Sequence, residues 1–152
     1  MSTKANVTTE QVQRRLNEVI RATSNPQPLM RSIANTLQDV ILEEFYTSGH
    51  GKWPALKHRE GQPLRLSGRL QASIVPYADN ETAAAGTNVI YAALQNNGAK
   101  QGAFGHTKRG APIPWGDVPG RRFIPVDDNG QITPTALERV LEAIDRFWQR
   151  MR

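Results

Sequence analysis

Apolar residues recur at helical spacing over the last part of the chain, and this pattern limits the fold more than any other. Thr133 and Pro134 supply the capping and first-turn residues that commonly begin a helix. The helix that follows is expected to bury one broad apolar face, because its apolar side chains return every three or four residues. The residues of this face are Leu137, Val140, Leu141, Ile144, Phe147, Trp148 and Met151. A face this wide must be covered, most simply by a small sheet.

Two further amphipathic helices are predicted at the N-terminal end. Thr8-x-x-Gln11 is typical of a capping box, and an apolar stripe at helical spacing follows it. Residues 24–28, SNPQP, should end this helix, because proline is tolerated in a first turn but not in a helix interior. The second helix is predicted from about Pro28 to Tyr46. A short turn between two amphipathic helices favours an antiparallel pair.

The middle of the chain loses this periodicity and is rich in glycine and proline. A loop is expected at 47–63, followed by a strand in the latter part of 64–77 and a returning strand of small residues at 82–87. A short helix should follow, capped by Asn88 and ended by Asn97-Gly98. A long loop is then expected at 98–120, and a candidate further strand at 121–126. The predicted fold is therefore α+β, as a single domain over residues 1–152. A small antiparallel sheet packs against the two N-terminal helices and the long C-terminal helix, and two long basic loops project.

The net charge of +5 is concentrated in those two loops. Residues 47–70 hold five basic residues against one acidic residue, and residues 98–122 do the same, so each segment carries +4. Residues 1–46 balance at zero. A strongly basic chain commonly has an anionic partner, but here the charge lies on glycine- and proline-rich segments rather than on the helices.

Several classes of protein are excluded by what the sequence lacks. The chain has no cysteine, which rules out disulfides, thiolate metal sites and cysteine nucleophiles. Its first residues lack the apolar run of a signal peptide, and no apolar stretch is long enough to span a bilayer. We therefore expect a protein made in the cytosol, without membrane contact.

No enzyme signature is found either. Ser67 lacks the G-x-S-x-G frame of a nucleophile elbow, and the glycine–lysine stretches do not fit a phosphate-binding loop. Asp127 and Asp128 could bind a metal, but acidic residues are also favourable just before a helix. Each histidine lies in a loop beside Gly, Lys or Arg, and none has a second His or a carboxylate at the spacing that a metal site on a helix needs. The three histidines are His50, His58 and His106. The expectation is a protein that is not an enzyme and uses no cofactor, metal or small-molecule substrate.

The segment Ile113–Pro125, IPWGDVPGRRFIP, combines prolines, large apolar side chains and adjacent arginines. Prolines reduce the entropy that a loop loses on ordering, so the segment suits a docking edge. Phe123 and Ile124 are expected to hold it to the sheet, which leaves Trp115, Arg121 and Arg122 for a partner. The neighbouring residues 98–111 have few apolar anchors, and we expect them to be mobile until a partner orders them.

Trp53 and Trp115 each lie in a proline-containing loop near basic residues. Each tryptophan could stack on nucleic-acid bases, pin its loop onto the body of the protein, or anchor a partner subunit. Aromatic residues make up only 7% of the chain, and the basic residues are not interleaved with them along a strand. Pinning or anchoring is therefore favoured over stacking.

Four segments stand in an order that is typical of one family: FYTSGHGKWPAL, PLRLSGRLQASI, AAAGTNVIYAALQNNG and IPWGDVPGRRFIP. Over roughly Phe45 to Pro125 the chain resembles the virion morphogenesis, or tail completion, proteins of Mu-like phages and prophages. Each motif alone is weak, whereas four in order with sensible gaps are fairly specific. The turn QNNG departs from the family, which often has an aromatic residue before this glycine.

The resemblance implies a structural protein that acts late in tailed-phage assembly, at the tail end or the head–tail junction. Such proteins work as copies in a ring or as assembly factors for one, in the cytoplasm of the bacterial host, with the virion as a further location. The implied partners are other copies and tail or connector proteins, with weak contact to DNA. The alternative is a basic nucleic-acid-binding protein that uses loops 47–70 and 98–122. The candidate interface residues are Trp53, Lys100, Lys108, Arg109, Trp115, Arg121 and Arg122.

Overall fold

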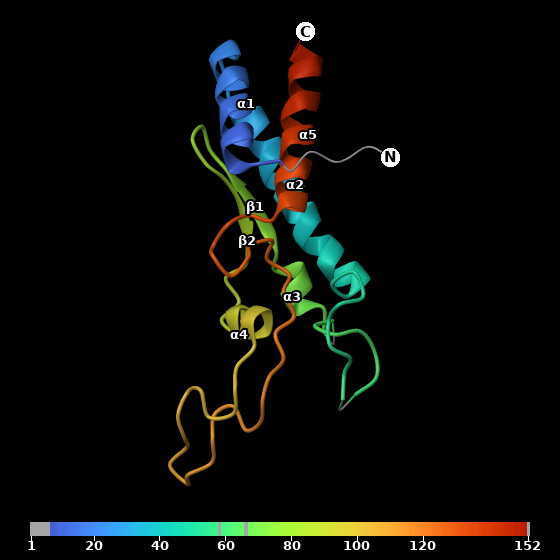
Figure 1. Ribbon diagram of the computed structural model, residues 1–152, viewed down its shortest axis with the longest axis vertical. Helices are drawn as coiled ribbons and strands as arrows, with labels where there is room; N and C mark the ends of the chain where they lie inside the picture. The colour runs from blue at the N-terminus through green and yellow to red at the C-terminus, as the bar shows by residue number, and fades with distance from the viewer. Residues whose placement is uncertain (1–6, 58, 66, 152) are drawn as a thin grey trace. The chain divides into compact units, whose positions relative to one another are not determined.

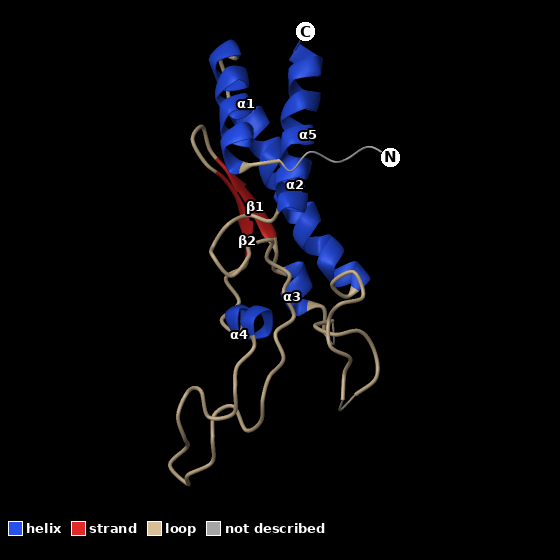
Figure 2. Ribbon diagram, in the orientation of Figure 1, coloured by secondary structure: helices blue, strands red, loops and turns tan. Residues whose placement is uncertain are grey.

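The computed structural model describes residues 7–57, 59–65 and 67–151. The described chain mixes helices with a two-stranded antiparallel sheet, which confirms the predicted α+β class (Figures 1 and 2). In chain order the elements are α1 Thr9–Ala22, α2 Gln27–Thr47, α3 Arg69–Ala72, β1 Val75–Ala78, β2 Ala83–Gly86, α4 Ala92–Asn97 and α5 Pro134–Met151. None of the described helices has both the length and the apolar character that a bilayer crossing needs.

The chain divides into two compact units. We call the first the helical unit; it comprises the residues up to Val40, Val75–Gly86, and the residues from Pro125 onward. We call the second the loop unit; it comprises Ile41–Ile74 and Thr87–Ile124. The expectation of one domain over residues 1–152 stays a prediction.

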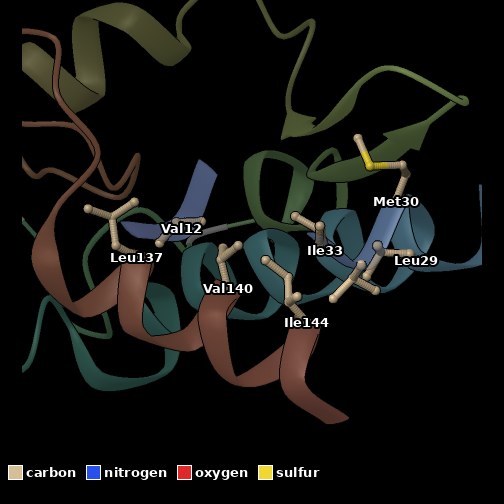
Figure 3. Packing of buried hydrophobic residues seen from close by; sticks show 8 residues of the cluster. Val12, Leu29, Met30, Ile33, Leu137, Val140 and Ile144 are labelled. Atoms are coloured by element: carbon tan, nitrogen blue, oxygen red, sulfur yellow. The ribbon is translucent and has the colours of Figure 1, made fainter. Parts of the chain in front are cut away.

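The helical unit is built around α1, the first part of α2, and α5. The helix α1 begins at the predicted capping box: Gln11 N donates to Thr8 Oγ1 at 3.2 Å, and Thr8 N donates to Gln11 Oε1 at 3.0 Å. Apolar side chains from the three helices meet in one core (Figure 3). Its buried members are Val12, Val19, Leu29, Met30, Ile33, Leu137, Val140 and Ile144. The amphipathic faces predicted from sequence thus pack against each other.

The hairpin of β1 and β2 packs one face on this core and leaves the other exposed. Ala78 and Ala83, which are partners across the hairpin, pack against the core. On the opposite face Val75 and Tyr77 are exposed, because neighbouring residues of a strand point to opposite sides. On β2 the partner of Tyr77 is Ala84, whose side chain is small and exposed. The outer face of the hairpin therefore stays uncovered within the described helical unit.

The candidate strand at 121–126 is wrong, and the hydrogen bonds of this segment give the reason. Arg121 N donates to the carbonyl of Gln95 at 2.9 Å, and the backbone N–H groups of Phe123 and Ile124 donate to Asn96 Oδ1 at 2.9 and 3.0 Å. The segment therefore uses the end of α4 as its hydrogen-bonding partner instead of a neighbouring strand.

The short helices also differ from expectation. The single turn α3 was not predicted, and α4 begins at Ala92 instead of near Asn88. Asn88 does not cap it, because Tyr91 occupies the N-cap position. The predicted end is confirmed: Gly98 follows Asn97 with a φ of +73°, the left-handed region that favours glycine.

Candidate interaction surface

Three aromatic rings form the centre of the loop unit. Phe45 and Phe123 are fully buried, with ring centroids 5.1 Å apart. The ring of Trp53 meets that of Phe45 edge-on, with a centroid distance of 5.8 Å and an interplanar angle of 89°. Trp53 Nε1 also donates to the backbone carbonyl of Arg122 at 2.9 Å. Trp53 therefore pins its own loop to the chain beside Phe123.

Arg121 is buried next to this cluster, with only 8% of its surface exposed. Its Nε and Nη2 atoms donate to the carbonyl of Pro54 at 3.0 and 2.9 Å, and Nη2 also donates to the carbonyl of Ala55 at 3.3 Å. Among the described residues no carboxylate lies within ion-pair distance of this guanidinium. Burial lowers the pKa of Arg121, and the nearby charge of Arg59 lowers it further. The side chain joins residues 53–57, which we call the Trp53 loop, to the segment that follows residue 120.

Residues 98–120, which we call the arm, leave the end of α4 and return to the same place (Figure 2). The outgoing and returning segments of the arm pair at its base, where Ala99 N donates to the Val118 carbonyl at 2.9 Å and Val118 N donates to the Ala99 carbonyl at 2.7 Å. A second pairing joins His106 and Pro112 nearer the tip. The long loop predicted here is thus an irregular hairpin with internal hydrogen bonds.

The base of the arm has no room for a side chain at Gly98. A Cβ atom there would lie 2.5 Å from both the backbone N of Gly120 and the backbone O of Val118. The φ of +73° adds backbone strain for any other residue.

Gly98→Ala is therefore expected to destabilise the loop unit by about 2–3 kcal/mol, since it combines strain with a backbone clash. Gly116→Ala is the matched control, because Gly116 has open space around its Cβ position. Urea unfolding followed by tryptophan fluorescence measures both variants. Equal stabilities for the two would show that the base of the arm is not tightly closed.

The arm exposes large apolar side chains beside positive charge. Trp115 is 82% exposed, and Phe104 and Ile113 are exposed on the same excursion. Lys100, Lys108 and Arg109 are exposed as well. Single exposed apolar residues are common on soluble proteins, but several large ones on one braced excursion are typical of an interaction site. The arm presents apolar contact area together with cations.

A pocket of about 740 Å³ lies where the Trp53 loop faces the base of the arm. Much of its lining is apolar, with Pro54, Leu56 and Val118 among the residues involved. Lys57, Arg59, Lys100 and Arg121 also line it, against the single acid Asp117, whose carboxylate lies 4.0 Å from Lys100 Nζ. Cations outnumber acids around this pocket, so its electrostatic potential favours an anionic group.

Two of the residues considered for metal or acid–base chemistry, Asp127 and His50, have other contacts. Asp127 Oδ1 accepts from the backbone N–H groups of Asn129 and Gln131 at 2.9 and 3.0 Å, which makes it a turn residue. His50 lies near Glu44, with 3.8 Å between Nε2 and Oε1, and burial raises the pKa of that carboxyl group. His106 is exposed on the arm, and His58 lies outside the described residues. Within the described chain no three His, Cys, Asp or Glu side chains converge as a metal site would require.

The predicted interface residues are thus divided by the structure. Trp115, Lys100, Lys108 and Arg109 lie exposed on the arm. Arg122 is exposed just after the arm, while Trp53 is half-buried and pinned. Arg121 is not available at the surface, contrary to the expectation that it is left for a partner, because its guanidinium is turned inward to two carbonyls. The pocket itself was not predicted, since its walls are distant in sequence.

Comparison with known proteins supports the resemblance seen in the sequence motifs. The model of the phage virion morphogenesis family matches residues 7–147. A relative, the Mu-like prophage FluMu G protein 2 of Haemophilus influenzae (strain ATCC 51907 / DSM 11121 / KW20 / Rd), is 34% identical over 134 residues. The match covers 88% of this chain and 86% of the relative. No solved structure matches the chain.

Proposed function

Because the chain belongs to the phage virion morphogenesis family, we propose that it completes the tail or joins head to tail through contacts made by its arm. Membership of the family makes the chain a phage assembly protein, whose partners include other phage proteins. The proposal goes further than family membership in three respects. It places the chain at tail completion or head–tail joining, it names the arm as the contact surface, and it arranges the copies in a ring.

The observation that carries this proposal is the exposure of Trp115 and Phe104 on a hydrogen-bonded excursion. Tryptophan is enriched among the residues that contribute most to protein interfaces, because it buries a large rigid surface at low entropic cost. Hydrogen bonds between Ala99 and Val118 hold the arm at its base. The arm therefore loses less conformational entropy when a partner binds than a free loop would. A protein that acts by surface complementarity needs such a feature and no reaction centre.

The test is complementation of a phage or prophage that lacks its own copy of the gene. Trp115→Ala with Phe104→Ala should leave the helix content and the unfolding midpoint unchanged, because both side chains are exposed. The titre of infectious particles should fall by about 100-fold or more, as expected when two central anchors of an interface are lost. Met151→Ala, which changes an exposed apolar residue at the end of α5, should complement fully. A normal titre from the double variant would contradict the proposal.

A second candidate function is nucleic-acid binding by the same arm, and the neighbourhood of exposed cations and Trp115 favours it. This function requires an affinity whose logarithm falls linearly with the logarithm of the salt concentration. A gel-shift titration at two salt concentrations tests it, with Lys108→Glu and Arg109→Glu combined as the variant. The absence of any shift at low salt would remove this candidate.

A further inference from the structure

The β1–β2 hairpin carries exposed apolar surface and negative charge together. Val75 and Tyr77 are exposed on its outer face, and Asp79 and Glu81 lie at its turn. Asp79 Oδ1 accepts from the backbone N–H groups of Glu81 and Thr82 at 2.8 and 2.6 Å, and Tyr77 Oη donates to Asp79 Oδ2 at 2.9 Å. These hydrogen bonds lower the pKa of Asp79, and Glu81 adds a second carboxylate at the turn.

The pocket of the loop unit has the complementary character. Apolar groups from Pro54, Leu56 and Val118 line it, and Lys57 and Lys100 supply positive charge there. Both lysine side chains are exposed, so they can reach an incoming acidic group. A ligand that fits this surface carries an apolar ring and a carboxylate on the same short segment.

We propose that the hairpin turn of one copy of this chain docks in the pocket of a second copy. The inference rests on the proposed function, in which copies form a ring, and names the surfaces that join them. The two surfaces differ, so the contact is head-to-tail, and its repetition forms a closed ring when the rotation between neighbouring copies divides a full turn evenly. Tyr77 enters the apolar part of the pocket, and Glu81 approaches Lys57 and Lys100.

The proposed contact depends on charge in a way that a purely apolar contact does not. Opposite charges at the rim of an interface increase the rate of association and select the partner, and salt screens them. Self-association should therefore weaken as the salt concentration rises. The apolar area around Tyr77 supplies the part of the affinity that survives at high salt.

A charge-swap experiment tests the inference by sedimentation of the full chain. The hairpin variant is Asn80→Lys with Glu81→Lys; it keeps Asp79, whose carboxylate holds the turn. The pocket variant is Lys57→Glu with Lys100→Glu. Each variant alone should be monomeric, because its two surfaces then carry like charge. An equimolar mixture should associate again, since each hairpin then finds a pocket of opposite charge. The chain that carries all four changes should also self-associate.

Circular dichroism of each variant confirms that it is folded, and Lys57→Gln with Lys100→Gln gives a milder pocket variant that should weaken association. A wild-type chain that stays monomeric up to its solubility limit overturns the inference. So does a hairpin variant that associates like wild type, or a mixture that does not associate. If wild type is monomeric while Trp115 and Phe104 remain essential for infectious particles, this inference alone fails. If the charge-swap pattern holds while the arm variant gives a normal titre, the proposed function of the arm alone fails.

Discussion

Phe45→Ala is expected to destabilise the loop unit by about 4 kcal/mol, the largest effect of any single change proposed for this chain. Phe45 is fully buried and contacts the rings of both Trp53 and Phe123. Truncation removes its own buried surface and leaves a cavity between two aromatic residues that cannot easily close it, because hydrogen bonds hold the Trp53 ring nitrogen and the Phe123 backbone N–H. Urea unfolding followed by tryptophan fluorescence measures the loss.

The neighbouring residue provides the control. Tyr46 is 60% exposed, and its ring lies 5.3 Å from the Arg65 guanidinium carbon. Tyr46→Ala should cost about 1 kcal/mol or less, since an exposed cation–π contact contributes little. If Phe45→Ala cost no more than Tyr46→Ala, the aromatic cluster would not be the core of the loop unit.

Arg121→Met is expected to destabilise the loop unit by about 3 kcal/mol. The change keeps most of the buried aliphatic length but removes the donors to the carbonyls of Pro54 and Ala55, which then lose these partners. Arg109→Met is the control on an exposed arginine of the same unit and should change stability by about 0.5 kcal/mol or less. Thermal unfolding of the two variants side by side makes the comparison. Similar midpoints would mean that Arg121 does not join the two segments.

Because Arg121 has this internal role, a charge reversal at Arg121 cannot test whether the arm docks on a partner. A charge reversal at Arg121 would place a carboxylate against two carbonyl oxygens and would measure folding rather than docking. Lys108 and Arg109 carry exposed charge on the arm, so reversing them alters the surface while leaving the buried contacts in place.

The elements with a strong local signal were predictable from the sequence. The capping box at Thr8 and the Thr133–Pro134 pair gave the starts of α1 and α5, because capping depends on a few neighbouring residues. The apolar faces of these helices followed from their periodicity, and Gly98 marked the end of α4. The concentration of charge in two loops was equally readable, since it needs only composition.

The features of the loop unit that depend on distant residues were not predictable. Whether Arg121 or Arg122 turns inward depends on the carbonyls of the Trp53 loop, more than sixty residues earlier in the chain. The apparent strand at 121–126 fails because Asn96 offers its side-chain oxygen to two backbone N–H groups. Both outcomes are tertiary, and a local pattern of apolar and basic residues is compatible with either. The pocket could not be predicted either, because its walls come from segments that are distant in sequence.

The proposed docking of the arm on phage proteins during assembly is tested most directly by cross-linking from the arm itself. A photoreactive amino acid replaces Trp115 in one sample and Arg14, an exposed position on α1, in another. Both are produced during phage assembly, and the cross-linked partners are identified by mass spectrometry. We expect position 115 to capture a phage-encoded structural protein or a second copy of this chain. Position 14 should capture it at least tenfold less often, as expected of a free surface compared with an interface anchor. Equal capture from both positions, or capture of nucleic acid alone from position 115, would show that the arm is not the docking site for phage proteins.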